Sequence, residues 1–264
     1  MELPINRFKR AILAGEFQLG FWVALANSAC AELSAASGYD WLVLDAEHGP
    51  NDVLTIMGQL QAVAPYHSHA VVRLPEGNAA LIKRYLDVGA QTLLIPMVDT
   101  DEQARALVDA TRYAPAGMRG MATMTRAARW SRVRNYVQRA REEICLIPQI
   151  ETVEALENID AIATTDGVDA VFIGPVDLSA SMGHVGQPGH PEVLAAIEKA
   201  LNRIRAAGKP AGTLSVDETL AKRFISMGFT FVAVGVDAVL LSKAVDTLRA
   251  RFAGGSAPTA SGGY

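Results

Sequence analysis

The 264-residue chain lacks the features that mark secreted and membrane proteins. Its two cysteines, Cys30 and Cys145, lie far apart inside apolar segments. This spacing excludes a disulfide framework and a cysteine metal site, and it predicts two buried thiols in a reducing compartment. The N-terminus has scattered charges and no apolar core of a signal peptide, and no apolar run approaches membrane-spanning length. We therefore expect a cytoplasmic protein.

A strong charge of one sign is also absent. The 24 basic and 28 acidic residues give a formal net charge of -4. This mild acidity offers no basic footprint for nucleic acid or for an anionic membrane, so we expect small-molecule partners. Half of the residues are hydrophobic, and the length suits either two small domains or one α/β barrel.

The chain does have a repeated alternation of apolar strands and amphipathic helices. A short helix over 6–14 comes first and is placed to cap one end of a barrel. Alternation implies a parallel sheet, and a count of eight strands favours closure into a (β/α)8 TIM barrel. The doubly wound alternative usually has a glycine-rich turn after its first strand, where this chain reads ALANSAC. The expected strands are 19–25, 41–48, 70–75, 92–98, 144–151, 170–177, 210–216 and 231–237.

The helices carry local start and stop signals. Asn51 or Asp52 and Thr100 are expected N-caps, Pro191 opens a helix after a long connection over 178–190, and Gly208 ends it. We expect one barrel domain over residues 1–252. The remaining residues, 253–264, are rich in Gly, Ser, Ala and Pro and are expected to be disordered.

Two apolar runs end abruptly in polar groups. Gln149 and Glu151 close CLIPQIET, and Asp177 closes AVFIGPVD. Active sites of such barrels form at the C-terminal ends of the strands, so these groups are expected to share one rim. One interpretation is that the two carboxylates cap the following helices. The other is a hard-cation site for Mg²⁺, Mn²⁺ or a similar ion, with Gln149 beside it.

Arg73 and His48 stand at two other strand ends. Arg73 lies within an apolar run, where it either forms a structural salt bridge to Glu47 or Glu151 or clamps a substrate carboxylate or a developing oxyanion. His48 is either a polar cap or a general base that Asp45 orients. Strict strand alternation puts Asp45 and His48 on opposite faces, unless the chain turns before His48.

The six lysines fall in helices or on the N-terminal side of strands. None projects from the C-terminal end of a strand, which argues against Schiff-base catalysis. An arginine-rich run over 119–141 either binds an anion or forms a solvated or subunit-facing surface.

Seven segments together resemble the metal-dependent pyruvate aldolases of the 4-hydroxy-2-oxoheptanedioate aldolase (HpcH/HpaI) family. The segments are LVLDAEHGPND, VVRLP, TLLIPMV, YAPAGMRG, QIET, VFIGPVDLSASMG and FVAVGVD. The resemblance runs over about residues 19–252, in the right order and spacing. It is specific for the family and says little about the substrate.

The resemblance implies a (β/α)8 barrel assembled as a homohexamer, with the last helix exchanged between neighbouring barrels. It implies a divalent ion, Mg²⁺, Mn²⁺ or Co²⁺, on Glu151 and Asp177. Arg73 would stabilise a pyruvate enolate, and His48, paired with Asp45, would be the general base. The other implied site residues are Gln149 beside the metal, the backbone of Val176 and Asp177 for the pyruvate carboxylate, Asp87 reaching a neighbour's site, and Trp22, Leu214 and Val236 shaping the pocket.

The implied activity is reversible cleavage of 4-hydroxy-2-oxo acids, such as 4-hydroxy-2-oxoheptanedioate, to pyruvate and an aldehyde of the succinic semialdehyde type, as in the catabolism of aromatic compounds. Three alternatives stay open: an aldolase for sugar-derived 2-keto-3-deoxy acids, an acyl-CoA lyase of the citrate-lyase-like group, and a catalytically silent barrel. The chain departs from the family after GMRG, where it reads MATMTRAARW. Met121 and Met124 in this loop are therefore expected to alter the aldehyde side.

Overall fold

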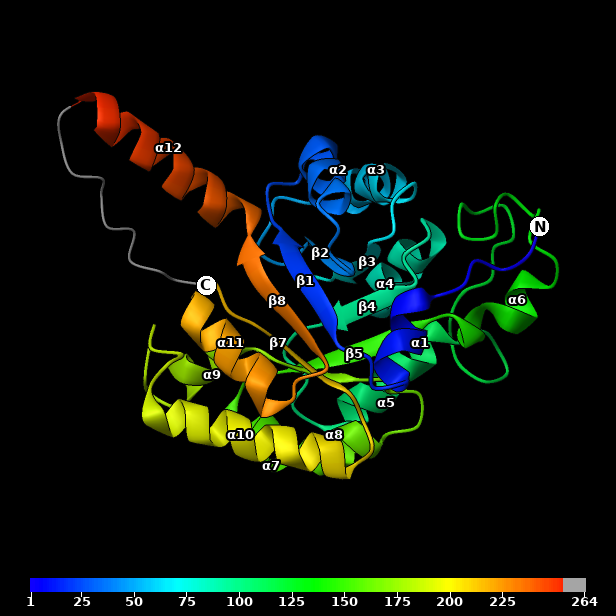
Figure 1. Ribbon diagram of the computed structural model, residues 1–264. Coiled ribbons are helices and arrows are strands. Elements are labelled where there is room, and N and C mark those ends of the chain that lie inside the picture. Colours follow the sequence, from blue (N-terminus) through cyan, green and yellow to red (C-terminus); the bar gives the residue numbers. More distant parts are fainter. Residues whose placement is uncertain (254–264) are drawn as a thin grey trace.

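The computed structural model describes residues 1–253, whose centre is a closed barrel of eight parallel strands in sequence order (Figure 1). Each strand pairs with the next, and the last pairs with the first, which confirms the predicted TIM barrel. Residue 253 ends a helix, and the rest of the expected tail lies outside the described residues. The strands are β1 (Gln18–Val23), β2 (Trp41–Asp45), β3 (His69–Arg73), β4 (Thr92–Ile95), β5 (Cys145–Ile150), β6 (Val171–Ile173), β7 (Ala211–Leu214) and β8 (Phe231–Val236).

Helices follow every strand and cover the outside of the barrel. The segment 153–164 is divided at Asn158 into two helices, and the segment 136–142 consists of one α-helical turn and a 3₁₀ turn. The helices are α1 (Arg7–Leu13), α2 (Ser28–Ala36), α3 (Val53–Val63), α4 (Ala79–Asp87), α5 (Asp101–Thr111), α6 (Tyr136–Arg139), η1 (Ala140–Glu142), α7 (Val153–Glu157), α8 (Ile159–Thr164), α9 (Pro175–Ser181), α10 (Pro191–Ala206), α11 (Glu218–Met227) and α12 (Asp237–Ala253).

The predicted local signals act as expected. Asp52 and Thr100 each close a capping box, in which the cap and the third helical residue bond each other's backbone. Pro191 is the first residue of α10, and Gly208 follows its C-cap with a φ of +73°. Both cysteines are free thiols; Cys145 is buried as predicted, whereas Cys30 on α2 is only half-buried.

The sixth strand is shorter than the apolar run suggested. It ends at Ile173, and Pro175 begins α9, so the prediction of a strand through Asp177 is wrong. Proline has no N–H for a sheet ladder, while its fixed φ suits the first turn of a helix. Asp177 therefore lies in the first turn of a helix, and the long connection expected over 178–190 shrinks to 182–190.

Aromatic rings fill the N-terminal end of the barrel. Phe8 of α1 packs against Trp41 and Phe231, with ring centroids 5.5 and 5.4 Å apart. A Cβ on Gly20 would lie 2.2 Å from the Trp41 ring, and one on Gly212 would lie 1.9 Å from the Phe231 ring. The two glycines therefore make room for the rings, and α1 closes this end as predicted.

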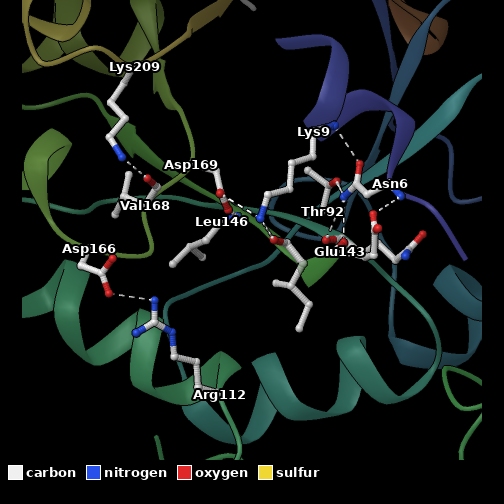
Figure 2. A network of polar contacts seen from close by, with 12 residues as sticks. Asn6, Lys9, Thr92, Arg112, Glu143, Leu146, Asp166, Val168, Asp169 and Lys209 are labelled. Carbon is white, nitrogen blue, oxygen red and sulfur yellow. Dashed lines mark hydrogen bonds and ion pairs between the residues drawn. The ribbon is translucent and has the colours of Figure 1, made fainter. Parts of the chain in front are cut away.

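A polar network ties α1 to the same end (Figure 2). Asn6 donates its backbone N–H to Glu143 and its side-chain amide to Thr92 Oγ1, at 2.6 and 2.9 Å. Lys9 Nζ lies 3.0 Å from Asp169 and donates to the carbonyl of Ile144. These bonds satisfy buried groups at the end of the barrel opposite the predicted site.

The last helix, α12, extends away from the barrel (Figure 1). It has no buried residue. None of the helices in residues 1–253 has the length and apolar composition needed to cross a bilayer. The exposed apolar side chains of α12 are Leu240, Leu241, Val245, Leu248 and Phe252.

Candidate active site

A cavity of about 240 Å³ opens at the C-terminal ends of the strands. This is the end at which TIM barrels carry their active sites, and it is where the sequence placed the site. Larger cavities, of about 510 to 620 Å³, lie around the N-terminal ends of the strands and so belong to the opposite end. The cavity is lined by Trp22, His48, Arg73, Gln149, Phe172, Gly174, Pro175, Val176, Asp177 and Leu214.

Arg73 is held by a buried carboxylate from the next strand. Its Nε and Nη2 donate to the two oxygens of Asp45 at 3.0 and 2.7 Å, because β2 and β3 pair these two residues directly. Trp22 Nε1–H also donates to Asp45, and the Arg73 guanidinium lies 4.7 Å from the centre of the Trp22 ring. Burial alone would raise the pKa of Asp45, but the hydrogen bonds and charge of Arg73 outweigh it and lower that pKa.

Asp45 does not orient the His48 ring, contrary to the expectation. Its Oδ1 instead accepts the backbone N–H groups of Glu47 and His48, at 3.0 and 3.3 Å. The chain does turn after Asp45. In this turn the Asp45 carboxylate accepts backbone N–H groups, and it also accepts hydrogen bonds from Arg73. The His48 side chain is 53% exposed, and its Nε2 lies 3.8 Å from Glu47 Oε1, beyond hydrogen-bond distance.

Glu47 is a site residue that sequence reasoning treated only as a salt-bridge partner. Its Oε2 lies 2.7 Å from Arg73 Nη1, so the structural salt bridge does form. Burial, together with repulsion from Asp45 and Asp177, raises the pKa of Glu47 to about 7 against the attraction of Arg73. Glu47 therefore belongs to the same charge cluster as the predicted metal ligands.

Glu151 lies beside the turn between β6 and α9. It accepts hydrogen bonds from the Gln149 side chain and from the Met97 N–H, the latter at 2.8 Å. A Cβ on Gly174 would lie 2.7 Å from Glu151 Oε2, so only glycine lets this turn approach so closely. Burial, and repulsion from Glu47 and Asp177, raise the pKa of Glu151 to about 7. The sharing of one ion by Glu151 and Asp177 stays a prediction.

The donor set fits a hard divalent cation. Asp45, Glu47, Glu151 and Asp177 bring four carboxylates to one region that holds the single guanidinium of Arg73. Gln149 Oε1 is buried and has no hydrogen-bond partner within residues 1–253. Oxygen donors with excess negative charge are the ligands that Mg²⁺ and Mn²⁺ prefer. Glu151 and Asp177 are therefore suitable ligands, with Gln149 beside them.

The first turn of α9 offers free backbone donors. Gly174 is the N-cap and Pro175 the first helical residue, so the N–H groups of Val176 and Asp177 precede the first intrahelical bond, made by Leu178. Both residues line the cavity. Their amides are placed to bind an anionic group.

Two of the three residues expected to shape the pocket line it. Trp22 and Leu214 are wall residues. Val236 is fully buried at the end of β8, in the core cluster that includes Trp22 and Phe172. It is not among the residues that line the cavity, so its part in shaping the pocket stays a prediction.

Asp87 lies far from this cavity, at the end of α4. Its Oδ1 accepts a hydrogen bond of 2.8 Å from the buried Arg119, whose guanidinium lies 4.5 Å from the centre of the Tyr113 ring. Arg119 is thus buried and not solvated. An active-site role for Asp87 requires a second copy of the chain and stays a prediction.

The lysines are placed as predicted. Lys9 and Lys209 lie at the opposite end of the barrel, where Lys209 Nζ donates to the carbonyl of Val168 (Figure 2). The cavity lining, all of it within the described residues, includes no lysine. No amine is therefore placed to form a Schiff base with a substrate in this cavity.

Comparison with known proteins identifies close relatives. The family model described as HpcH/HpaI aldolase/citrate lyase matches residues 18–244. A hydroxypyruvate/pyruvate aldolase of Pseudomonas aeruginosa is 57% identical over 263 residues, covering 99% of this chain and 98% of the relative. A 2-keto-3-deoxy-L-rhamnonate aldolase of Klebsiella pneumoniae subsp. pneumoniae is 54% identical over 253 residues, covering 96% and 95%.

A third named activity occurs at the same level of similarity. A 4-hydroxy-2-oxo-heptane-1,7-dioate aldolase of Salmonella heidelberg is 54% identical over 248 residues, covering 94% of both chains. Among solved structures, an HpcH/HpaI aldolase/citrate lyase family protein from Burkholderia cenocepacia J2315 has a TM-score of 0.90 at 36% identity. That match covers 94% of this chain and 99% of the other.

Proposed function

The chain belongs to the HpcH/HpaI aldolase/citrate lyase family, and we propose that it is a metal-dependent pyruvate aldolase that cleaves 4-hydroxy-2-oxo acids. The observation that carries the proposal is the cavity in which Arg73, Gln149 and the free amides of α9 meet beside Glu151. A 2-oxo acid needs a cation for its keto oxygen and donors for its carboxylate; the residues at this cavity offer ligands for the cation and N–H donors for the carboxylate.

Arg73 is placed to stabilise the enolate. When the C3–C4 bond breaks, negative charge develops on the former keto oxygen. The guanidinium is fixed by Asp45 and Glu47, with contacts of 2.7 Å to each, so it needs little reorganisation as the charge appears. The substrate carboxylate would accept the N–H groups of Val176 and Asp177.

His48 is the proposed general base. It stands at the mouth of the cavity, where its imidazole can take the proton from the C4 hydroxyl and return it in the synthetic direction. Asp45 contributes indirectly: it accepts the backbone N–H of His48 and so fixes the turn that carries the ring. In this arrangement Asp45 is a positioning residue for both Arg73 and His48.

A divalent ion would be held by Glu151 and Asp177, with Gln149 as a further oxygen donor. Bound there, it would supply Lewis-acid stabilisation of the developing negative charge. Mg²⁺, Mn²⁺ and Co²⁺ all suit such oxygen donors, and Mg²⁺ and Mn²⁺ most closely.

The proposed substrate is 4-hydroxy-2-oxoheptanedioate, which gives pyruvate and a succinic semialdehyde-type aldehyde. The sugar-derived 2-keto-3-deoxy acids are the second candidate, since one relative is named for 2-keto-3-deoxy-L-rhamnonate. Trp22, Phe172 and Leu214 give the cavity an apolar wall, which would favour an aldehyde without a distal charge where the aldehyde part lies against it. For a single copy of the chain, this apolar wall supports the second candidate, the sugar-derived 2-keto-3-deoxy acids.

An acyl-CoA lyase is less well supported. It needs a basic groove for the CoA phosphates near the site. The arginine-rich run does not provide one there, because Arg119 is buried against Asp87, and Arg126 and Arg129 line cavities around the N-terminal end of β4.

The proposed assembly is a homohexamer in which neighbours exchange α12. The support is the exposed apolar stripe of α12, which this barrel leaves uncovered. In such an assembly Asp87 would reach a neighbour's cavity, and the loop with Met121 and Met124 would lie on the aldehyde side.

The test is pyruvate release from a panel of 4-hydroxy-2-oxo acids by the full chain, with and without a chelator. The panel includes 4-hydroxy-2-oxoheptanedioate and 2-keto-3-deoxy-L-rhamnonate. We expect activity that a chelator abolishes and that added Mg²⁺ or Mn²⁺ restores. Activity that survives complete chelation, or a pyruvate–lysine adduct trapped by borohydride, would overturn the mechanism.

Arg73→Ala tests the enolate role within the same assay. We expect kcat to fall by roughly 10²–10³ with a smaller change in KM, as for loss of one donor to a developing oxyanion. Arg73→Lys keeps a positive charge beside Asp45, so it is the variant to measure if Arg73→Ala does not fold. Arg105→Ala, an exposed arginine of α5 with a side chain 54% accessible, is the control. A rise in KM with unchanged kcat would contradict the role.

A further inference from the structure

Two histidines and a glutamate meet beside the connection between α9 and α10, outside the cavity described above. His184 lies in the connection, His190 is the N-cap of α10, and Glu192 is in its first turn. The ligand atoms of the three side chains lie within 4.8 Å of one another. Within residues 1–253 this is the one set of three His, Cys, Asp or Glu side chains gathered so closely.

The three side chains contact one another directly, so an ion would replace these contacts. His184 Nε2 lies 3.0 Å from Glu192 Oε2, and the rings of His184 and His190 are stacked with centroids 3.7 Å apart. A tetrahedral ion with bonds of about 2.0–2.1 Å holds its ligand atoms about 3.3 Å apart. The Glu192 side chain is 72% exposed, so a rotamer change can bring its carboxylate to that distance.

The donor set selects the class of cation. Two imidazoles and one carboxylate suit Zn²⁺ and similar borderline ions, whereas Mg²⁺ prefers oxygen donors alone. On coordination through Nε2, the neutral His184 ring carries its proton on Nδ1, and its hydrogen bond to Glu192 is given up. His190 gives up the 3.3 Å hydrogen bond that its Nδ1 accepts from the Glu192 N–H, because its single lone pair cannot serve both partners.

His184, His190 and Glu192 lie where a metal crosslink would restrain the connection between α9 and α10. The connection contains Gly183 and Gly186, both in the left-handed region, with φ of +86° and +71°. It is joined to α9 by the His184 N–H, which donates to the carbonyl of Ser179 at 2.7 Å. An ion bound by His184, His190 and Glu192 would therefore tie the end of α9 to the start of α10.

We infer that His184, His190 and Glu192 form a second cation site, which takes one Zn²⁺-class ion per chain and braces the connection between α9 and α10. The site goes beyond the proposed function, since no step of the aldol cleavage uses these residues. Three protein donors would hold the ion, and water would complete its coordination.

The test measures Zn²⁺ binding to the chelator-stripped full chain by calorimetry, with Mg²⁺ in excess throughout. We compare wild type with His184→Ala and with the matched control His67→Ala, an exposed histidine near the opposite end of the barrel. Loss of one of three ligands is expected to weaken zinc binding at this site at least about tenfold in His184→Ala, which is about 1.4 kcal/mol. His67→Ala should bind zinc as wild type does. Zinc should also raise the Tm of wild type and of His67→Ala, but not that of His184→Ala.

Equal zinc binding by wild type and His184→Ala, or an adventitious ion only, would overturn the site. His190→Gln provides a second variant, should His184→Ala fold poorly. Glu151→Gln is expected to keep this zinc equivalent while losing lyase activity. Failure of the zinc site and failure of the proposed aldolase are therefore seen in separate measurements.

Discussion

At the scale of single residues, Arg73 shows how the barrel prepares a charge for chemistry. Asp45 and Arg73 are each the fifth residue of their strand, and the parallel register of β2 and β3 sets them side by side. A guanidinium with two carboxylate partners is expensive to move, because each displacement breaks charge-assisted bonds in a poorly solvated site. The rigidity of Arg73 therefore follows from sheet register.

His69, at the start of β3, provides a pH-dependent test of stability. Its ring is stacked on Phe8 with centroids 5.8 Å apart, and its Nε2 lies 2.8 Å from Thr92 Oγ1. Burial lowers the pKa of His69 to about 4. Between this value and the unfolded pKa of about 6.5, the unfolded chain binds a proton that the folded chain does not. The free energy of unfolding is therefore expected to fall as pH falls through this window.

The size of the effect is set by the accessibility of the ring. The full pKa difference is worth roughly 3 kcal/mol, but the ring is partly accessible from a cavity, so we expect about 1–2 kcal/mol lost between pH 7 and pH 5. Urea unfolding at fixed protein concentration measures it. His69→Gln should lose less over this range, whereas the exposed neighbour His67→Gln should lose as much as wild type. Equal losses in wild type and His69→Gln would refute the assignment.

The sequence predicted which residues line the site better than it predicted the contacts between them. Arg73, Gln149 and Asp177 line the cavity. Their places at or just beyond strand ends could be predicted from the local sequence pattern. The pairing of Asp45 with Arg73 depends on register between strands, which no local pattern encodes.

At the scale of elements, the barrel interior depends on two strand glycines. Gly212 of β7 faces the Phe231 ring, which a Cβ would approach to 1.9 Å. Gly212→Ala is expected to lower the free energy of unfolding by about 3 kcal/mol or more, because overpacking forces a buried ring off its rotamer. Gly189→Ala is the control, since its Cβ would meet no heavy atom within 4 Å. Urea unfolding that shows equal stability for the two variants would contradict this packing argument.

Short-range bonds determine where some helices begin, and one proline determines where β6 ends and α9 begins. The capping boxes at Asp52 and Thr100 were predictable because their bonds span three residues. The apolar run over 170–176 predicted a strand that continues too far, and the error lies at Pro175, which starts α9 instead. That one proline places the amides of Val176 and Asp177 at the cavity.

At the scale of the whole molecule, closure of the barrel was predictable and the covering of α12 was not. Eight strand–helix units leave few arrangements other than a closed parallel barrel. The helix α12 obeys the same apolar periodicity as the packed helices, yet residues 1–253 bury none of its side chains. What covers an amphipathic helix is decided by a partner surface that a single chain does not specify.

The proposed exchange of α12 makes oligomeric state the last test. Leu241 and Leu248 lie on one stripe of the helix and are 54% and 55% exposed. The double variant Leu241→Asp/Leu248→Asp places two charges in the interface that exchange would bury, so we expect a smaller assembly by light scattering and reduced lyase activity. Lys243→Glu, on the opposite side of α12, changes the net charge equally and should leave the assembly intact. If both variants keep the wild-type mass, then α12 does not join the subunits, and Asp87 loses its route to a neighbour's cavity.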